Sequence, residues 1–209
     1  MSYSNILDKV QRYYSEKVKT HGATARGVDW NSVDSQRLRF AQLLKVVNRA
    51  QHFTINDYGC GYGALAGHLR DEGYSFSYVG FDISSEMIAK AKEVHGEDPQ
   101  ITFVTEERML TEAVYTVASG IFNVKLETAA AEWDKYVLQT LGTIDALSRN
   151  GFAINVLTKY SDAEFMRPDL YYADPLFLFD YCKTNYSRFV TLLHDYPLYE
   201  FTILVRKNS

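Results

Sequence analysis

Apolar residues recur at helical spacing near the start of the chain. Two segments show this pattern, from Tyr3 to about Val18 and from Asp34 to Val47, and side chains three or four positions apart share one face of a helix. The sequence HGATARGVDWNS between them lacks an apolar period and is expected to be a loop. The pattern therefore predicts two helices within residues 1–50.

Beyond Gln51, short apolar runs alternate with helical patterns. The runs FTINDY, FSYVGFD, ITFV, YTVASG and GFAINVLT are typical of strands, and strands separated by helices pair in parallel. A helix after the second strand is expected to begin at Ser84 or Ser85, because serine caps helix N-termini. Another helix, from about Ala131 to Asn150, is expected to end at Asn150-Gly151, a favourable C-cap.

The C-terminal pattern differs, because RFVTLLHDY and LYEFTILVRK are separated only by a turn at Pro197. Strands so close in sequence pair antiparallel. No internal repeat, low-complexity stretch or linker divides the chain. The sequence therefore predicts a single domain over residues 1–209, with an α/β core at 51–209.

Composition and charge exclude several classes of protein. With 46% hydrophobic and 23% charged residues the chain is of the ordinary globular type, and its formal net charge of -4 disfavours a nucleic-acid partner. It has no apolar run near the roughly 20 residues of a membrane span, and its start lacks a secretory pattern. The two cysteines have no metal-ligand spacing. We expect a cytoplasmic protein without a metal or a membrane partner.

The segment INDYGCGYGALAGHL carries the main candidate for chemistry. A predicted strand ends at Asp57, and Gly59, Gly61 and Gly63 follow before a predicted helix. Such a loop lets the backbone turn sharply and approach a ligand, with helix N–H groups directed towards it. Dinucleotide enzymes use a related G-x-G-x-x-G/A loop, and Gly61, Gly63 and Ala66 satisfy that looser template.

Three neighbouring features favour a ligand that carries an amino acid. The Asp57 carboxylate would repel a pyrophosphate and attract an amino group. Asp82, at the end of the second strand, can accept hydrogen bonds from both hydroxyls of a ribose, and Ile83 and Met87 offer apolar surface to adenine. The terminal hairpin is the third feature, because a dinucleotide fold does not need it.

With these residues the sequence resembles the class I S-adenosylmethionine-dependent methyltransferases. The resemblance covers residues 53–207: Asp57, Gly59, Gly61 and Gly63 match the family's acidic-glycine loop, and Asp82 matches its ribose-binding acid. It implies a Rossmann-like α/β fold. The expected sheet has seven mostly parallel strands in the order 3-2-1-4-5-7-6, with helices on both faces and an antiparallel C-terminal hairpin.

The same resemblance implies S-adenosylmethionine as cofactor and S-adenosylhomocysteine (SAH) as its product. It predicts cofactor contacts along the methionine and ribose at Gly59, Cys60 and Gly61, at the adenine amino group from Glu106 or Glu107, and at the sulfonium end from Ser119, Gly120, Ile121 and Phe122.

The segment HGATARGVDW, with the residues that follow it, resembles the front segment of a small-molecule subgroup of the family, which usually forms a lid. Residues 1–50 are therefore expected to be a helical lid segment. Trp30 and Arg39 are candidate contacts, because a guanidinium can bind the cofactor's carboxylate through two hydrogen bonds. The equally open alternative is that Trp30 packs in the protein and Arg39 is a solvated charge.

Methyl transfer from a sulfonium is a one-step displacement, so positioning can supply most of the acceleration. A base is needed only if the acceptor is a hydroxyl or a protonated amine. The preferred candidates are Tyr172 and Asp174, after the fifth strand, and His194, in the last hairpin. Other side chains near the ends of the fourth and fifth strands or in the expected lid also stay open: His21, Asn123, Lys159, Tyr160 and Tyr171. The leading hypothesis is methyl transfer to a small-molecule acceptor. An NAD-binding oxidoreductase and a non-catalytic S-adenosylmethionine-binding protein are the alternatives, and the oligomeric state stays open.

Overall fold

Within residues 3–22, 24 and 32–207, which the computed structural model describes, the strands form one seven-stranded sheet. Neighbours in the order β3-β2-β1-β4-β5 are parallel, and β7 lies antiparallel to both β5 and β6. The predicted order is confirmed. The strands are β1 (Phe53–Tyr58), β2 (Phe76–Phe81), β3 (Ile101–Val104), β4 (Ala113–Ser119), β5 (Ser148–Leu157), β6 (Phe189–Leu193) and β7 (Glu200–Arg206).

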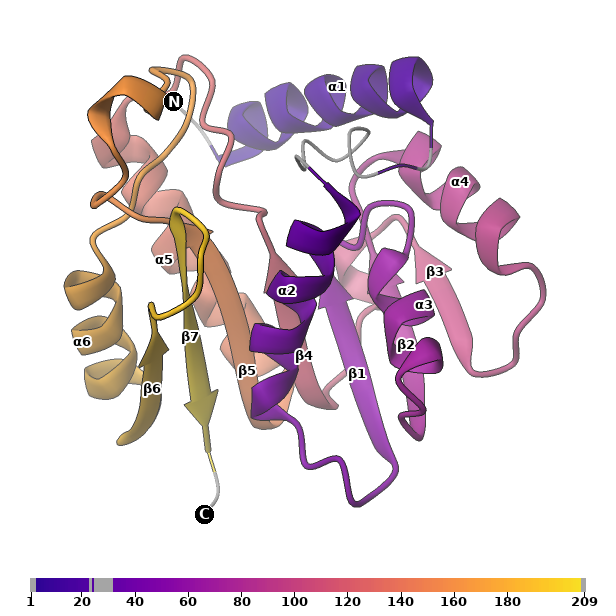
Figure 1. Cartoon of the computed structure of the whole chain (residues 1–209). Coiled ribbons are helices and arrows are strands. Elements are labelled where there is room, and N and C mark those ends of the chain that lie inside the picture. Colours follow the sequence, from indigo (N-terminus) through magenta and orange to yellow (C-terminus); the bar gives the residue numbers. More distant parts are fainter. Residues whose placement is uncertain (1–2, 23, 25–31, 208–209) are drawn as a thin grey trace.

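Helices cover both faces of this sheet, as predicted (Figure 1). One face packs against α2, α3 and α4, and the other against α5 and α6. Their bounds, with those of α1 and the short 3-10 helices, are α1 (Tyr3–His21), α2 (Val33–Leu43), η2 (Leu44–Val46), α3 (Ala64–Asp71), α4 (Ser85–His95), η3 (Glu107–Met109), α5 (Ala130–Ala146), η4 (Ala163–Phe165) and α6 (Pro175–Asn185).

The interior strand β5 shows why the pattern GFAINVL suits this architecture. Phe152, Ile154 and Val156 belong to the core cluster on the α5 and α6 side, and Ala153 belongs to the cluster on the α2 and α3 side. Successive side chains of a strand point to opposite faces. Since both faces are covered, a nearly continuous apolar run replaces the alternation of a half-exposed strand.

The two N-terminal helices have different places in the fold. Figure 1 shows α1 lying across the edge of the sheet to which the parallel strands point, and Ile6 and Val10 of α1 are buried in the core cluster on the α5 side. Helix α2 packs instead on the opposite sheet face through Phe40 and Leu43. The helices are confirmed, but α2 is part of the layered core. Trp30 lies outside the described residues.

The C-cap prediction for α5 is wrong. The helix ends at Ala146, and Asn150 and Gly151 lie within β5. A Cβ atom on Gly151 would lie 2.2 Å from the carbonyl oxygen of Val205 on β7. The glycine thus permits the close approach of two strands, and the dipeptide imitates a helix end because glycine serves both purposes.

The last two strands form the predicted hairpin. Phe189 of β6 pairs with Arg206 of β7, and Leu193 pairs with Thr202. The connection is held by Tyr196, whose hydroxyl oxygen lies 2.9 Å from that of Thr202. None of the helices in the described part of the chain has the length and apolarity to cross a membrane.

Candidate functional site

The loop between β1 and α3 requires its three alternate glycines for backbone reasons. Gly59, Gly61 and Gly63 have φ angles of 81°, 55° and 79°, in the left-handed region that other residues rarely adopt. Space is restricted as well, because a Cβ atom on Gly59 would lie 2.3 Å from the Cγ2 atom of Ile121. At Gly63 it would lie 2.7 Å from the Phe103 ring. The loop therefore holds a fixed shape that side chains would disrupt.

Backbone hydrogen bonds tie this loop to the end of β2. The N–H groups of Gly59 and Cys60 both donate to the Phe81 carbonyl, each at 2.8 Å. The next free N–H, that of Gly61, donates to Oδ2 of Asp82 at 2.9 Å. A β2 glycine that the sequence reasoning passed over makes this possible: a Cβ on Gly80 would lie 2.9 Å from the Cys60 sulfur.

Asp82 is oriented by two backbone amides. Its Oδ1 accepts from the Ser84 N–H at 2.9 Å, and its Oδ2 accepts from Gly61. Burial raises the pKa of the Asp82 carboxyl to about 6, against the lowering effect of these two hydrogen bonds. Each carboxylate oxygen can accept more than one hydrogen bond. The fixed carboxylate can therefore receive two further donors from the cavity beside it.

Asp57, at the end of β1, is only 3% exposed. The Tyr78 hydroxyl donates to its Oδ2 atom at 2.7 Å. Burial raises the pKa of Asp57 to about 7, the Tyr78 hydrogen bond opposes the rise, and the charge of Asp82 adds to it. A cation in the neighbouring cavity would favour the ionised form of this carboxyl.

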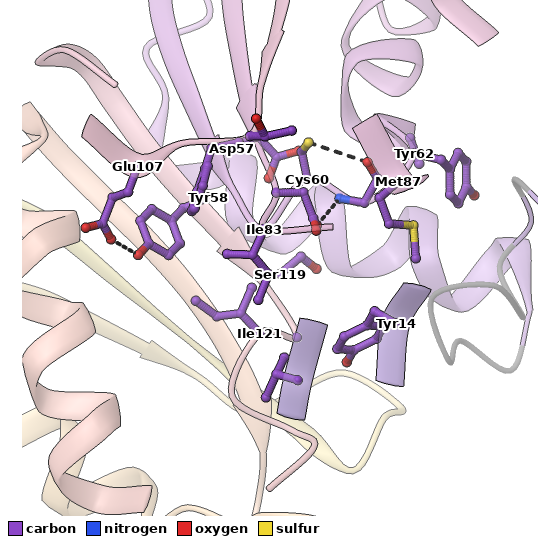
Figure 2. Close-up of a pocket in the computed structure, with 18 of the residues that line it drawn as sticks. Tyr14, Asp57, Tyr58, Cys60, Tyr62, Ile83, Met87, Glu107, Ser119 and Ile121 are labelled. Carbon is purple, nitrogen blue, oxygen red and sulfur yellow. Dashed lines mark hydrogen bonds between the residues drawn. The ribbon is translucent and has the colours of Figure 1, made fainter. Parts of the chain in front are cut away.

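A cavity of about 290 Å³ opens where these groups meet, at the carboxyl ends of β1, β2 and β4. Three side chains of α1, Leu7, Val10 and Tyr14, line it from the other side. Figure 2 shows Tyr14 at the same end of the cavity as Met87, and Glu107 at the opposite end. The cavity is therefore enclosed between the glycine loop and the first helix.

Helix α1 is attached beside this cavity by polar contacts to the start of α4. The Ser15 hydroxyl lies 2.8 Å from the hydroxyl oxygen of Ser84, the N-cap residue of α4, and donates to Glu86 at 2.8 Å. Lys19 forms an ion pair with Glu86 at 2.8 Å. Hydrogen bonds from Lys19 and then Ser15 lower the pKa of Glu86 to about 2. These contacts connect α1 to the segment that follows Asp82.

Comparison with known proteins decides the family. A model described as "Methyltransferase domain" matches residues 55–137. A curated relative from Mycobacterium tuberculosis (strain ATCC 25618 / H37Rv), named "Putative methyltransferase Rv1506c", is 52% identical over 166 residues, which are 79% of this chain and 100% of the relative. The chain belongs to the methyltransferase family. Methyltransferases of this family take their methyl group from S-adenosylmethionine.

Solved structures share the fold of this methyltransferase. Magnesium protoporphyrin IX methyltransferase (ChlM) from Synechocystis PCC 6803, with bound SAH, superposes with a TM-score of 0.68 at 14% identity, covering 99% of both chains. The DhpI-SAM-HEP complex gives a TM-score of 0.64 at 14% identity, covering 96% of this chain and 98% of DhpI. The NAD-dependent alternative is not favoured by these matches.

Most of the predicted cofactor residues of the methyltransferase line the cavity. They come from four segments that are far apart in sequence and adjacent at the edge of the sheet. These residues are Asp57, Gly59, Cys60, Gly61, Asp82, Ile83, Met87, Glu107, Ser119, Gly120 and Ile121.

Two predicted contacts at the carboxyl edge lie elsewhere. Phe122 is fully buried in the core on the α5 side, and its carbonyl oxygen accepts from the Trp133 indole at 2.8 Å. Glu106 is exposed and forms an ion pair with Arg108. Its neighbour Glu107 lines the cavity and accepts a hydrogen bond from the Tyr58 hydroxyl. The prediction left these two glutamates open, and the structure brings Glu107 to the site.

Arg39 was predicted as a contact to the cofactor's carboxylate, and the structure gives it another partner. Its Nε and terminal nitrogen donate to the two carboxylate oxygens of Glu200 on β7, each at 2.7 Å. Both side chains are buried, and Arg39 is not among the residues that line the cavity. The structure thus pairs this guanidinium with a carboxylate on β7 and does not bring it to the cavity.

The three predicted catalytic side chains also lie outside the cavity lining. The Tyr172 hydroxyl accepts from the backbone N–H of Arg167 at 2.9 Å. Asp174 caps α6 and forms an ion pair with Lys159 at 2.7 Å. His194 follows β6 and packs its exposed ring against aromatic side chains. The structure separates these groups from the cavity that holds the cofactor candidates.

The sequence analysis expected a lid within residues 1–50, but it did not identify the α1 side chains that line the cavity, and it missed two further contacts. Leu7, Val10 and Tyr14 share one helix face, so the apolar period could have identified them, but nothing in the sequence says which element covers the site. Tyr62 lies within the glycine motif and donates through its hydroxyl to Gln36 of α2 at 3.1 Å. Both of these residues line the cavity.

Proposed function

We propose that this methyltransferase transfers the methyl group of S-adenosylmethionine to a small-molecule acceptor by in-line displacement. The cofactor supplies a methyl group on a positively charged sulfur. Asp57, the glycine loop and Asp82 would hold this cofactor, which would give its methyl group to the acceptor and keep the electron pair of the broken carbon–sulfur bond as the neutral thioether SAH. The observation that carries this proposal is the meeting of Asp57, the glycine loop and Asp82 around one cavity.

The chemistry of the two carboxyls fits this cofactor. Asp57 is a buried acid with a raised pKa, so its ionised form is unfavourable unless a positive charge lies beside it. The amino group of the cofactor would supply that charge. Asp82 is held by two amides and has acceptor capacity left for a ribose diol. The bound SAH of ChlM and the complexes of DhpI support the same choice by likeness of fold.

Positioning and exclusion of water are the main contributions expected from the protein. Among the described residues that line the cavity there is no histidine or lysine, which favours an acceptor that reacts without strong base catalysis. Leu7 and Val10 of α1 cover the cavity with apolar surface, and the contacts of Ser15 hold the helix in place. We therefore infer that α1 forms the lid, whereas α2, which also lines the cavity through Gln36 and Phe40, belongs to the layered core.

Titration calorimetry with SAH is the first test. We expect wild-type protein to bind SAH, and the Asp82→Asn variant to bind it at least tenfold more weakly. The matched control is Asp71→Asn, an exposed acid at the end of α3, which should bind as wild type does. Absence of SAH binding by the folded wild-type protein would refute the proposal.

Turnover separates an enzyme from a non-catalytic binding protein. Release of SAH from S-adenosylmethionine should be measured with a panel of small hydroxyl, amine and thiol acceptors. Acceptor-dependent release supports the enzyme. Tight binding without release for any acceptor supports the binding protein instead. The cytoplasmic location and the single domain stay predictions of the sequence.

A further inference from the structure

The site described so far offers no partner to one charged group of S-adenosylmethionine, the carboxylate of its methionine part. Arg39, the residue that the sequence suggested for it, is paired with Glu200. Among the described residues that line the cofactor cavity there is no arginine, lysine or histidine. A carboxylate in this cavity therefore has to be bound by neutral donors.

The order of the strands indicates where this carboxylate would lie. Asp82 and Asp57 lie at the ends of the neighbouring strands β2 and β1, and β4 follows on the other side of β1. A ligand with its ribose at Asp82 and its amino group at Asp57 therefore continues towards β4. Helix α2 packs against β4, β5 and β7 and begins near the edge to which the parallel strands point (Figure 1). Its residue Gln36 lines the cavity.

The carboxamide of Gln36 is buried and held in one orientation. The residue is 6% exposed, and its Oε1 atom accepts from the Tyr62 hydroxyl at 3.1 Å. Burial raises the pKa of this hydroxyl, so it stays a donor at neutral pH. In the described part of the chain, no protein group accepts a hydrogen bond from Nε2 of Gln36, and this atom is not sealed in the interior. Its N–H groups are therefore available to a ligand.

The first turn of α3 adds backbone donors to the same wall of the cavity. The helix begins at Ala64, which lines the cavity, and its N-cap residue Gly63 makes no side-chain capping hydrogen bond. The first N–H groups of a helix have no partner within it, and a partial positive charge results at this end. Tyr62 directly precedes the turn and connects it to Gln36. A helix N-terminus of this kind stabilises a carboxylate.

We propose that Gln36 binds the carboxylate of S-adenosylmethionine, together with the first turn of α3, and that Tyr62 positions the carboxamide. This inference rests on the proposed methyl transfer and adds how the site recognises the amino-acid end of the cofactor. Asp57 receives the amino group, and a neutral amide receives the carboxylate. A cationic side chain beside Asp57 would form an ion pair with it and compete with the amino group of the cofactor.

The test titrates the full chain calorimetrically with two ligands, SAH and decarboxylated SAH, which keeps the amino group and lacks the carboxylate. The Gln36→Leu variant removes the amide donors with little change in side-chain volume. The matched control is Gln42→Leu, which removes another buried carboxamide of α2, one that does not line the cavity. Circular dichroism and the thermal midpoint verify that all the proteins are folded.

The Gln36→Leu variant is expected to bind SAH about tenfold more weakly than wild type, because a hydrogen bond to a charged group is lost. It should bind decarboxylated SAH as wild type does, and the control should bind both ligands as wild type does. Gln36→Glu should weaken SAH binding further, since it places two carboxylates together, without weakening the binding of decarboxylated SAH. Equal losses for both ligands, or an SAH affinity unchanged by Gln36→Leu, overturn the assignment.

The positioning role of Tyr62 has its own test. Tyr62→Phe should weaken the binding of SAH but not that of decarboxylated SAH. It should add no loss to the Gln36→Leu variant, because the hydroxyl acts through Gln36. Additive losses in the double variant would show that Tyr62 acts on the ligand independently of Gln36.

The wild-type titrations distinguish this result from a failure of the proposed function. If wild type binds SAH and the Gln36 variants lose affinity for both ligands alike, this assignment fails and the methyl transfer stands. If wild type binds neither ligand, the proposed methyl transfer fails, and the assignment of the carboxylate fails with it.

Discussion

Replacing Asp57 by asparagine is expected to stabilise the protein without cofactor at neutral pH. Burial raises the pKa of this carboxyl from 3.8 to about 7. Between those values the folded protein keeps a proton that the unfolded chain has released. Asp57's contribution to the unfolding free energy is therefore fully present below pH 4 and lost as the pH rises to 7. At about 1.36 kcal/mol per pH unit, the loss is on the order of 4 kcal/mol.

The Asp57→Asn variant should avoid this loss because an amide does not ionise. Its side-chain oxygen can still accept the Tyr78 hydroxyl, which donates to Asp57 in the wild type at 2.7 Å. The same change should weaken SAH binding by about 1.5–3 kcal/mol, because an ionised partner of the amino group is lost. Cofactor binding and apo stability are thus expected to move in opposite directions at this one position.

The pH dependence of SAH affinity provides a second measure of the same carboxyl. Only ionised Asp57 pairs with the amino group, so wild-type affinity should fall about tenfold per pH unit below pH 7. Asp82, whose pKa is raised to about 6, adds its own dependence at lower pH. The Asp57→Asn variant should have nearly constant affinity between pH 6.5 and 8.

Urea unfolding at pH 5, 6, 7 and 8 gives the free energies, and calorimetry with SAH over the same range gives the affinities. The Asp71→Asn variant controls for the loss of a charge at an exposed site. Parallel stability curves for wild type and the Asp57→Asn variant would show that Asp57 does not hold a proton in the folded state. An SAH affinity unchanged by that variant would refute the pairing with an amino group.

Four further changes test other parts of the structure. Asp82→Ala should weaken SAH binding by about 1–3 kcal/mol in calorimetry, by removing charge-assisted acceptors of the ribose, and unchanged affinity would place the ribose elsewhere. Gly59→Ala should lower the unfolding free energy measured in urea by about 1–3 kcal/mol, because alanine is strained at a positive φ and its Cβ would collide with Ile121. A variant as stable as the wild type would contradict this. Arg39→Met should lower the unfolding free energy by about 3–5 kcal/mol in the same assay, because it leaves the Glu200 carboxylate buried without its partner. Adding Glu200→Leu removes that charge and should restore most of the lost stability, and no recovery would contradict the pairing. Ser15→Ala should increase hydrogen exchange in α1 and the dissociation rate of SAH, and an unchanged rate would show that α1 is not a lid.

The sequence could predict the strand order because local patterns and one resemblance agree. Each strand reads as a short apolar run, and the last two runs are too close in sequence to pair in parallel. Asn150-Gly151 shows the limit of such reasoning. The same glycine that would end a helix also permits close approach to Val205, and only the arrangement of β5 against β7 distinguishes the two roles.

The residues of the site also fall into two groups, those that the sequence could predict and those that it could not. Residues fixed by the local turn, such as Gly59, Gly61 and Asp82, could be predicted, because their backbone role and their proximity arise from one strand-loop-helix unit and its neighbouring strand. Arg39 could not, since its partner Glu200 is 161 positions away in sequence. A buried ion pair between α2 and β7 and a solvated helix charge have the same local pattern.

Helix α1 covers the cofactor cavity, and neither the local sequence pattern nor the glycine loop indicates which of its side chains do so. One of its faces closes the cofactor cavity with Leu7 and Val10, and Ser15 attaches the helix to the start of α4. A helix placed in this way can exclude water from the reacting atoms and select the acceptor at the same time. Substitutions in α1 should therefore change the acceptor specificity of this protein, whereas its recognition of the cofactor should depend on the glycine loop and on the ends of β1 and β2.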